Sequence, residues 1–392
     1  MTITYIITFC VLLLIAYLFD FTSSKTKIPS VILLLIMGWG ARQIAVLFNI
    51  NLPDFSIIFP VLGTVGLILI VLEGSLELEF NKSKIALIKR SLLGAFFTMA
   101  VTAFLLAFLF HYFGDYSYKD SLLNAIPFCV ISSAIAIPSV RNLRSSNREF
   151  IIYESSLSDI MGVLFFNFIA LNEVITFSSF THFSWLLFIV SIISFFATIG
   201  LSLLLSNIEH HIKFVPIILL IILIYAISEI YHLPALIFIL VFGLFIGNLD
   251  ELKHIRWLEF FHPDALDKEV QKFKELTIEA AFVVRALFFL LFGYVLETSE
   301  ILNTDTLIWA AVIVGIVFLF RIVQLKVSKL PLVPLLFVAP RGLITVLLFL
   351  SIVPENNIAL VNRSLIIQVI VLSALLMMFG LMATSKKREG KL

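Results

Sequence analysis

The chain has 392 residues, of which 61% are hydrophobic and only 14% are charged, and its formal net charge is +1. Soluble globular proteins are about 45 to 50% apolar, so this composition excludes a soluble protein and indicates an integral membrane protein. The sequence contains no zinc-binding, P-loop or dinucleotide-binding spacing, and we therefore expect no cofactor and no nucleic-acid partner.

Thirteen apolar runs match the length of a membrane-spanning helix, which needs about 20 mostly apolar residues. The predicted spans are 3–20, 28–47, 57–73, 86–113, 121–140, 149–171, 183–206, 214–230, 233–248, 276–297, 306–325, 331–353 and 364–383. The first run lacks a basic head and a small-residue cleavage site, so we expect a membrane helix there and not a signal peptide. The sequence therefore predicts an all-α integral membrane protein.

Basic residues alternate between the two sides of the predicted membrane. One set of loops holds nearly all of the Lys and Arg residues, including the tail SKKREGKL, whereas the other set holds only Arg42, Lys119 and Arg363. Basic loops stay preferentially in the cytoplasm, so an odd number of spans places the N-terminus outside and the tail inside. The short loops favour a bacterial inner membrane.

Two spans contain a proline beside small or polar residues. They are the fifth, with CVISSAIAIPSV around Pro138, and the twelfth, with LFVAPRGLITV around Pro340. Proline removes a backbone hydrogen bond, and freed backbone at membrane depth is tolerated only in the protein interior or along a cavity. Either proline alone would fit an ordinary kink. Together they occupy matching positions in two six-helix halves joined by span 7, which predicts inverted repeats with a binding site between two discontinuous helices.

The sixth span carries two carboxylates, although a charge at the bilayer centre costs about 2.5 to 3.5 kcal/mol on insertion scales. Asp159 and Ser155 are four residues apart and share a helix face, so their oxygens could bind one cation. Glu154 points elsewhere and needs a partner, because an unpaired buried ion is much costlier than a paired one. Arg321 and Arg341 are the candidate partners.

Glu73, near the end of the third span, has two interpretations. It is either a third cation ligand or the first residue of a cytoplasmic acidic patch with Glu77 and Glu79. Spacing alone leaves both open. Arg285, nearer a helix start, is expected to snorkel to the membrane interface.

Four motifs resemble the monovalent cation:proton antiporters, in the NhaP-like CPA1 branch related to eukaryotic sodium/proton exchangers. LEGSLEL at 72–78 resembles the family's third-helix L-F-E-G-G-L-E-L, and ESSLSD at 154–159 resembles its sixth-helix E-S-L-L-N-D. The arginine of LFRIVQ matches the one that pairs with the sixth-helix glutamate, and PRGLITVLL at 340–348 resembles the G-L-R-G-A-V segment of the interrupted twelfth helix. The resemblance covers nearly the whole chain and implies the thirteen-helix NhaA- and NapA-like fold.

The resemblance also implies roles for the polar residues. Asp159 would carry the cation and the proton in turn, with Ser155, Ser158 and Glu73 as candidate Na⁺ ligands. Glu154 would pair with Arg321. Arg341 would lie at the interrupted twelfth helix and help to balance its helix-end dipoles.

Two positions depart from the family pattern. Ser158 stands where the family has asparagine, and Ile137 replaces the aspartate of the fifth-helix Thr-Asp-Pro. Ser132 and Ser133 could supply hydroxyls in its place, or the carbonyls of the broken helix could suffice. The loss of one charge leaves the ion selectivity open.

The predicted function is electroneutral exchange of Na⁺ or Li⁺ for H⁺, since a partly desolvated carboxylate binds a proton or a cation but not both. We expect an elevator-type homodimer. The predicted divisions are scaffold helices at 1–81, core helices at 82–172, a linker helix and further scaffold at 173–305, core helices at 306–384 and a cytoplasmic tail at 385–392.

Three other functions fit parts of the sequence. A K⁺/H⁺ or broadly selective exchanger would keep the fold and change the ion. A transport-inactive sensor would keep the antiporter fold without its transport activity. An intramembrane enzyme would use Glu154 and Asp159 as an acid/base pair, but a separation of five residues places them about 140° apart around a helix, which disfavours a shared reacting atom.

Overall fold

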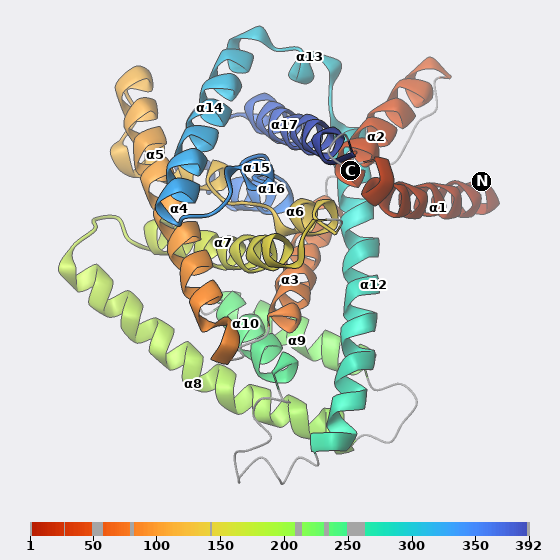
Figure 1. The fold of residues 1–392 in the computed structure, drawn as a ribbon, viewed down its shortest axis with the longest axis vertical. Coiled ribbons are helices and arrows are strands. Elements are labelled where there is room, and N and C mark those ends of the chain that lie inside the picture. Colours follow the sequence, from red (N-terminus) through yellow and green to blue (C-terminus); the bar gives the residue numbers. More distant parts are fainter. Residues whose placement is uncertain are drawn as a thin grey trace. The chain divides into compact units, whose positions relative to one another are not determined.

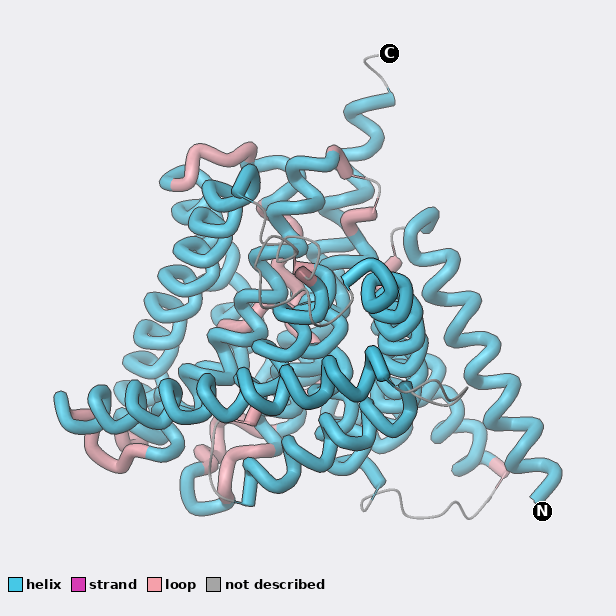
Figure 2. Tube along the Cα trace, turned by 90° about the horizontal axis from the view of Figure 1, so that it is seen from below, coloured by secondary structure: helices cyan, strands magenta, loops and turns pink. Residues whose placement is uncertain are grey.

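A computed structural model describes residues 2–26, 28–48, 58–78, 82–141, 143–207, 214–230, 235–248 and 263–389. Throughout these residues the protein is built from helices joined by loops, and they contain no strand (Figures 1 and 2). Eight helices of this described part are long and apolar enough to cross a membrane. The all-α prediction is confirmed, and the total of thirteen spans stays a prediction.

The predicted spans correspond closely to helices. The longer ones are α1 (Thr2–Thr26), α2 (Ser30–Leu47), α3 (Ile58–Glu77), α4 (Ile85–Gly114), α7 (Ser145–Leu171), α8 (Phe177–Asn207), α9 (Phe214–Ile230), α10 (Leu236–Gly247), α12 (Pro263–Val295), α14 (Thr304–Val327) and α17 (Arg363–Glu389). The shorter ones are η1 (Lys82–Lys84), α5 (Tyr118–Ala125), η2 (Ile126–Phe128), α6 (Ser133–Ser139), α13 (Thr298–Ile301), α15 (Leu332–Leu335), α16 (Leu343–Leu350) and η4 (Pro354–Asn356). Glu79 of the predicted acidic patch and residues 390–392 of the predicted tail lie outside the described residues.

The helices pack into two compact units. The first comprises Met1–Thr64, Arg90–Gly162 and Val283–Leu392, and the second comprises Val65–Lys89 and Val163–Phe282. The first unit holds both interrupted spans and the charged part of α7. The division into a mobile core and a dimerising scaffold concerns motion and assembly, and it stays a prediction.

In the second unit, α3 and α10 approach closely through small residues. A Cβ on Gly243 would overlap the Ser75 side chain, and one on Gly247 would crowd the backbone of Leu76. The Asn248 side chain then donates to the Leu78 carbonyl at 2.7 Å. This bond satisfies a backbone oxygen just beyond the end of α3.

Both predicted interruptions lie in the first unit. The fifth span runs as α5 and η2, loses helical structure over 129–132, and resumes as α6, so Pro138 lies inside α6 and not in the break. The twelfth span runs as α15, is non-helical over 336–342, and resumes as α16, so Pro340 lies within its break. The break of the fifth span is therefore set ahead of its proline, where the polar pair Ser132 and Ser133 begins the second half-helix.

The two breaks contact each other directly. The Ser132 backbone N–H donates to the Pro340 carbonyl at 2.9 Å. A Cβ on Gly342 would press against the Ser132 hydroxyl and the side chain of Ile135. The glycine therefore permits the close approach, and part of the backbone freed in each break is satisfied by the other.

A pair of glycines brings α2 and α12 together in the same unit. A Cβ on Gly38 would overlap the backbone oxygen of Leu290, and one on Gly293 would overlap the backbone oxygen of Leu35. Small residues let helix backbones approach closely within a membrane. Since the obstructing atoms are backbone atoms on both sides, they cannot move aside as a side chain would.

We expect Gly38→Leu to destabilise the protein by at least the cost of overpacking, about 1 to 3 kcal/mol, and to lower the Tm of the purified protein in detergent. Gly40→Leu is the matched control, because Gly40 lies on the same helix and a Cβ added there would meet no heavy atom within 4 Å. Equal Tm values for the two variants would contradict the packing argument.

Candidate functional site

The middle of α7 carries an unusual group of buried polar side chains. Glu154, Ser155, Ser156, Ser158 and Asp159 are each at most 3% exposed. Burying a polar group costs free energy unless the group is hydrogen-bonded. The partners of these side chains therefore decide what this part of the helix can do.

The Asp159 side chain, on α7, is hydrogen-bonded to the first residue of α6. The Ser133 hydroxyl donates a hydrogen bond to its Oδ2, and the Ser133 backbone N–H points at the same oxygen from 3.4 Å. No described residue donates a hydrogen bond to Oδ1, although this atom is buried. The carboxylate therefore has one anchored oxygen and one oxygen available to another species.

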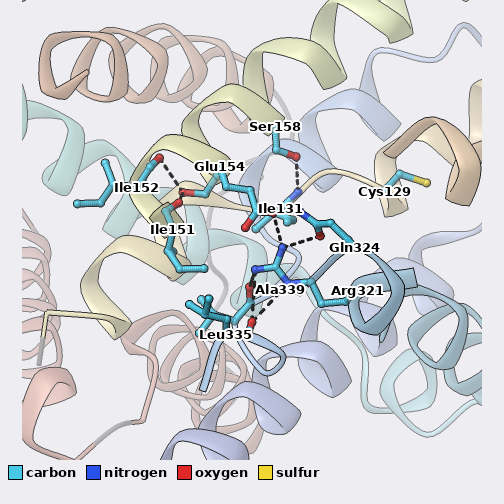
Figure 3. Close-up of polar contacts among 12 residues, drawn as sticks. Cys129, Ile131, Ile151, Ile152, Glu154, Ser158, Arg321, Gln324, Leu335 and Ala339 are labelled. Atoms are coloured by element: carbon cyan, nitrogen blue, oxygen red, sulfur yellow. Dashed lines mark hydrogen bonds and ion pairs between the residues drawn. The ribbon is translucent and has the colours of Figure 1, made fainter. Parts of the chain in front are cut away.

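Ser158 anchors the same segment of α7 to the break of the fifth span. Its hydroxyl accepts a hydrogen bond from the Ile131 backbone N–H at 3.0 Å (Figure 3). Ile131 lies between η2 and α6, so this N–H has no helical partner of its own. The serine side chain thus satisfies a backbone group that the helix break has freed.

Glu154 forms a buried ion pair with Arg321, and both side chains are 1% exposed. The Glu154 Oε1 accepts hydrogen bonds from Arg321 Nη1 and from the Gln324 amide, and the guanidinium also donates to Gln324 Oε1 at 2.9 Å (Figure 3). The three side chains form a closed triangle. Oε2 of Glu154 is buried without a hydrogen-bond partner in the described part of the chain.

Arg321 also binds the end of the first half of the twelfth span. Its Nε and Nη2 lie 3.4 and 3.3 Å from the Leu335 carbonyl, and Nη2 lies 3.4 Å from the Val338 carbonyl. Leu335 is the last residue of α15, and Val338 lies in the break that follows. The guanidinium therefore supplies donors to carbonyls at the point where the helix is interrupted.

Arg341 binds the end of the first half of the fifth span. Its Nε donates to the Phe128 carbonyl at 2.6 Å, its Nη1 donates to the Ala339 carbonyl at 2.8 Å, and its Nη2 lies 3.4 Å from the Cys129 carbonyl. Its own backbone N–H donates to the Ser373 hydroxyl at 3.0 Å. Each broken helix is thus capped by an arginine, and Arg341 reaches across from the break of the other span.

Other residues singled out in the sequence lie differently. The Ser155 hydroxyl donates to the Ile151 carbonyl of its own helix at 2.8 Å, and the structure gives it no hydrogen bond to Asp159. Ser132 contributes its backbone to the crossing of the breaks. Glu73 is half-buried on α3 in the second compact unit, so its role as a ligand stays a prediction.

Sequence reasoning missed Gln324, which completes the triangle with Glu154 and Arg321. The available signal was its position, since a polar residue three places after Arg321 shares a helix face with it. It also missed Gly94 on α4, where a Cβ would overlap the Gln324 amide. Only the packing of α4 against α14 reveals why that position has no side chain.

Comparison with known proteins decides the family. The sequence pattern described as sodium/hydrogen exchanger, transmembrane, matches residues 10–385. The chain belongs to the sodium/hydrogen exchanger family. The resemblance noted in the four motifs is therefore confirmed, and the chain is a multi-pass membrane protein of a family of cation/proton transporters, which are not enzymes.

Solved structures support the fold. The structure of the sodium proton antiporter MjNhaP1 from Methanocaldococcus jannaschii at pH 8 is 18% identical, covers 96% of this chain and 99% of its own, and superposes with a TM-score of 0.70. A second structure of MjNhaP1, from electron microscopy, is 19% identical, covers 97% and 95%, and has a TM-score of 0.68. No curated protein matches the sequence. The predicted antiporter fold is thus confirmed.

The ion pair at the centre of the triangle predicts strong energetic coupling. Removing one partner of a buried pair costs about 3 to 5 kcal/mol, because the other charge is left uncompensated. We expect Glu154→Gln and Arg321→Gln each to lower the Tm strongly and the double variant to lose less than the sum of the two.

The control is the pair Arg42–Glu297, with N and O atoms 3.2 Å apart, in which Glu297 is exposed and Arg42 is half-buried. The same cycle on that pair should show a coupling of about 0 to 1 kcal/mol. Additive losses at Glu154 and Arg321 would show that the buried pair does not act as a unit.

Proposed function

We propose that this protein exchanges Na⁺ or Li⁺ for H⁺, with Asp159 binding the cation and the proton in turn. The observation that carries this proposal is the buried Asp159 carboxylate beside the two crossing breaks, with Oδ1 lacking a hydrogen-bond partner among the described residues. A buried carboxylate without a counter-charge is costly. Either a proton or a cation relieves that cost, and the two exclude each other on the same oxygen.

The surroundings of Asp159 suit a weakly held hard cation. Such ions prefer carboxylate, hydroxyl and carbonyl oxygens. The Ser133 hydroxyl lies beside the carboxylate, and the non-helical residues 129–132 directly precede Ser133 in the chain. Within the described residues no group of three or more His, Cys, Asp or Glu side chains could hold a metal ion. A single carboxylate with neutral oxygens favours an ion that binds and leaves readily.

The Glu154–Arg321 pair supports electroneutral exchange. Glu154 is compensated by a guanidinium, which is itself held by Gln324 and by the Leu335 carbonyl. Asp159 is then the one carboxylate of the α7 group that changes its bound species during the cycle. One proton would be released for each monovalent cation bound.

The crossing of the breaks supports an elevator-type movement. The Ser132–Pro340 hydrogen bond and the contacts of Arg341 join the two interrupted spans into one block. We propose that the core helices 82–172 and 306–384 move with this block against a dimer-forming scaffold, in a bacterial inner membrane with the C-terminus in the cytoplasm.

A K⁺/H⁺ exchanger is the second candidate. The observation that favours it is Ile137, which stands on α6 where the resembling family has an aspartate. Without that second carboxylate the site has a weaker negative electrostatic field. Such a field discriminates less between Na⁺ and the larger K⁺, so K⁺ belongs in every assay.

Asp159→Asn should abolish exchange while leaving folding intact, because the amide neither binds a proton nor compensates a cation. The measurement is the change of internal pH in proteoliposomes after addition of Na⁺, Li⁺ or K⁺ in turn. Glu149→Gln is the matched control on the same helix, since its carboxylate accepts a hydrogen bond from the exposed Ser145. Wild-type rates in the Asp159 variant would remove the proposed carrier.

Ser133→Ala should raise the cation concentration for half-maximal exchange about tenfold or more, because a hydrogen bond to a charged group is worth about 1.5 to 3 kcal/mol. Ser139→Ala is the control on the same short helix, where the hydroxyl donates only to the Ile135 carbonyl at 2.7 Å. The same proteoliposome titration measures both. An unchanged half-maximal concentration for Ser133→Ala would exclude this hydroxyl from the site.

A further inference from the structure

A groove runs between α4 and α14, and Asp159 is not among the residues that line it. It encloses about 550 Å³, within the range of about 300 to 1,000 Å³ that is typical of ligand pockets. All of the residues that line it belong to the first compact unit.

Most of the groove wall is apolar and exposed. Phe97 is 59% exposed and Val101 is 44% exposed on α4, and Val323 is 49% exposed on α14. Apolar side chains facing outward from membrane helices are ordinary by themselves. The polar end of this groove distinguishes it from an ordinary membrane-facing surface.

Two basic side chains, Arg90 and Lys329, lie at one end of the groove. Gly94 on α4 and Gln324 on α14 face each other, and from that point Arg90 lies one turn back along α4 while Lys329 lies just beyond the end of α14. The end of α4 contacts the start of α14 through aromatic rings, so the helices run in opposite directions and both cations are at the same end. None of the residues that line the groove is acidic.

This distribution matches an amphiphile with an anionic head. A phosphate would bind Arg90 and Lys329, and acyl chains would cover the apolar wall towards Val101. A soluble anion would leave that wall uncovered, and a zwitterionic lipid would bring a second cation to a cationic end. We propose that this groove binds an anionic phospholipid.

The occupant would also contact the buried ion-pair triangle. Gln324 lines the groove and at the same time bonds Glu154 and Arg321. Gly94 leaves the space that the Gln324 amide occupies beside α4. A lipid in the groove therefore holds Gln324 in the position that supports the pair, and its effect on transport rests on the proposed exchange function.

The test measures the Kd for phosphatidylglycerol in mixed micelles, with phosphatidylcholine of the same acyl chains and soluble glycerol phosphate as separate probes. The full-length wild type should bind phosphatidylglycerol in preference to both. Arg90→Gln combined with Lys329→Gln should weaken that binding about 30-fold, from the usual contribution of two basic residues at an anionic membrane surface.

Lys326→Gln combined with Arg144→Gln is the matched control, because both residues are exposed and neither lines the groove. That variant should keep the wild-type Kd. Equal losses in the two double variants would mean a general surface-charge effect and would overturn the site. Equal binding of phosphatidylglycerol and phosphatidylcholine, or tight binding of glycerol phosphate alone, would also overturn it.

A second readout separates this proposal from the proposed function. In proteoliposomes, phosphatidylglycerol should raise the exchange rate of the wild type and of the control variant, but not of Arg90→Gln with Lys329→Gln. If no cation drives exchange in the wild type in any lipid, the exchange proposal fails, while the micelle Kd values still decide the lipid site.

Discussion

Two broken helices that cross inside an apolar core impose the main constraint on this structure. Each break frees backbone groups that its surroundings must satisfy, because buried N–H and carbonyl groups are costly when unpaired. The breaks satisfy each other in part, through the bond from Ser132 to Pro340, and Gly342 leaves room for that contact. Ser158 of α7 and two arginines bind further groups. The crossing therefore explains why so many polar side chains gather at one place.

Charge is unevenly distributed around the crossing. Arg321 and Arg341 both donate to main-chain carbonyls, and Arg321 also pairs with Glu154. Asp159 instead receives hydrogen bonds from neutral Ser133 and keeps one oxygen without a hydrogen-bond partner in the described residues. The structure thus separates a carboxylate that is paired with a guanidinium from one that is hydrogen-bonded only to a neutral serine. This separation is the physical basis of the proposed exchange.

Gln324 connects the interior to the membrane-facing surface. Its amide completes the triangle inside the protein, and its side chain also lines the groove between α4 and α14. The position of this amide depends on Gly94, which belongs to a different span. The segment that contains Gln324 shows only that this residue shares a helix face with Arg321, and the space that it occupies is set by a residue far away in the sequence. This is why the sequence motifs led to Glu154 and Arg321 and passed over Gln324.

The sequence by itself determined the all-helical membrane fold, because apolar runs of spanning length have only one way to satisfy their backbone in a bilayer. It also determined that buried Glu154 needs an arginine and that two spans are interrupted. Only the tertiary structure decided that the fifth span breaks before Pro138, and that the Ser155 hydroxyl bonds its own helix instead of Asp159. Helix periodicity shows which residues share a face. It does not show which acceptor a hydroxyl finds first, since that depends on the elements packed around it.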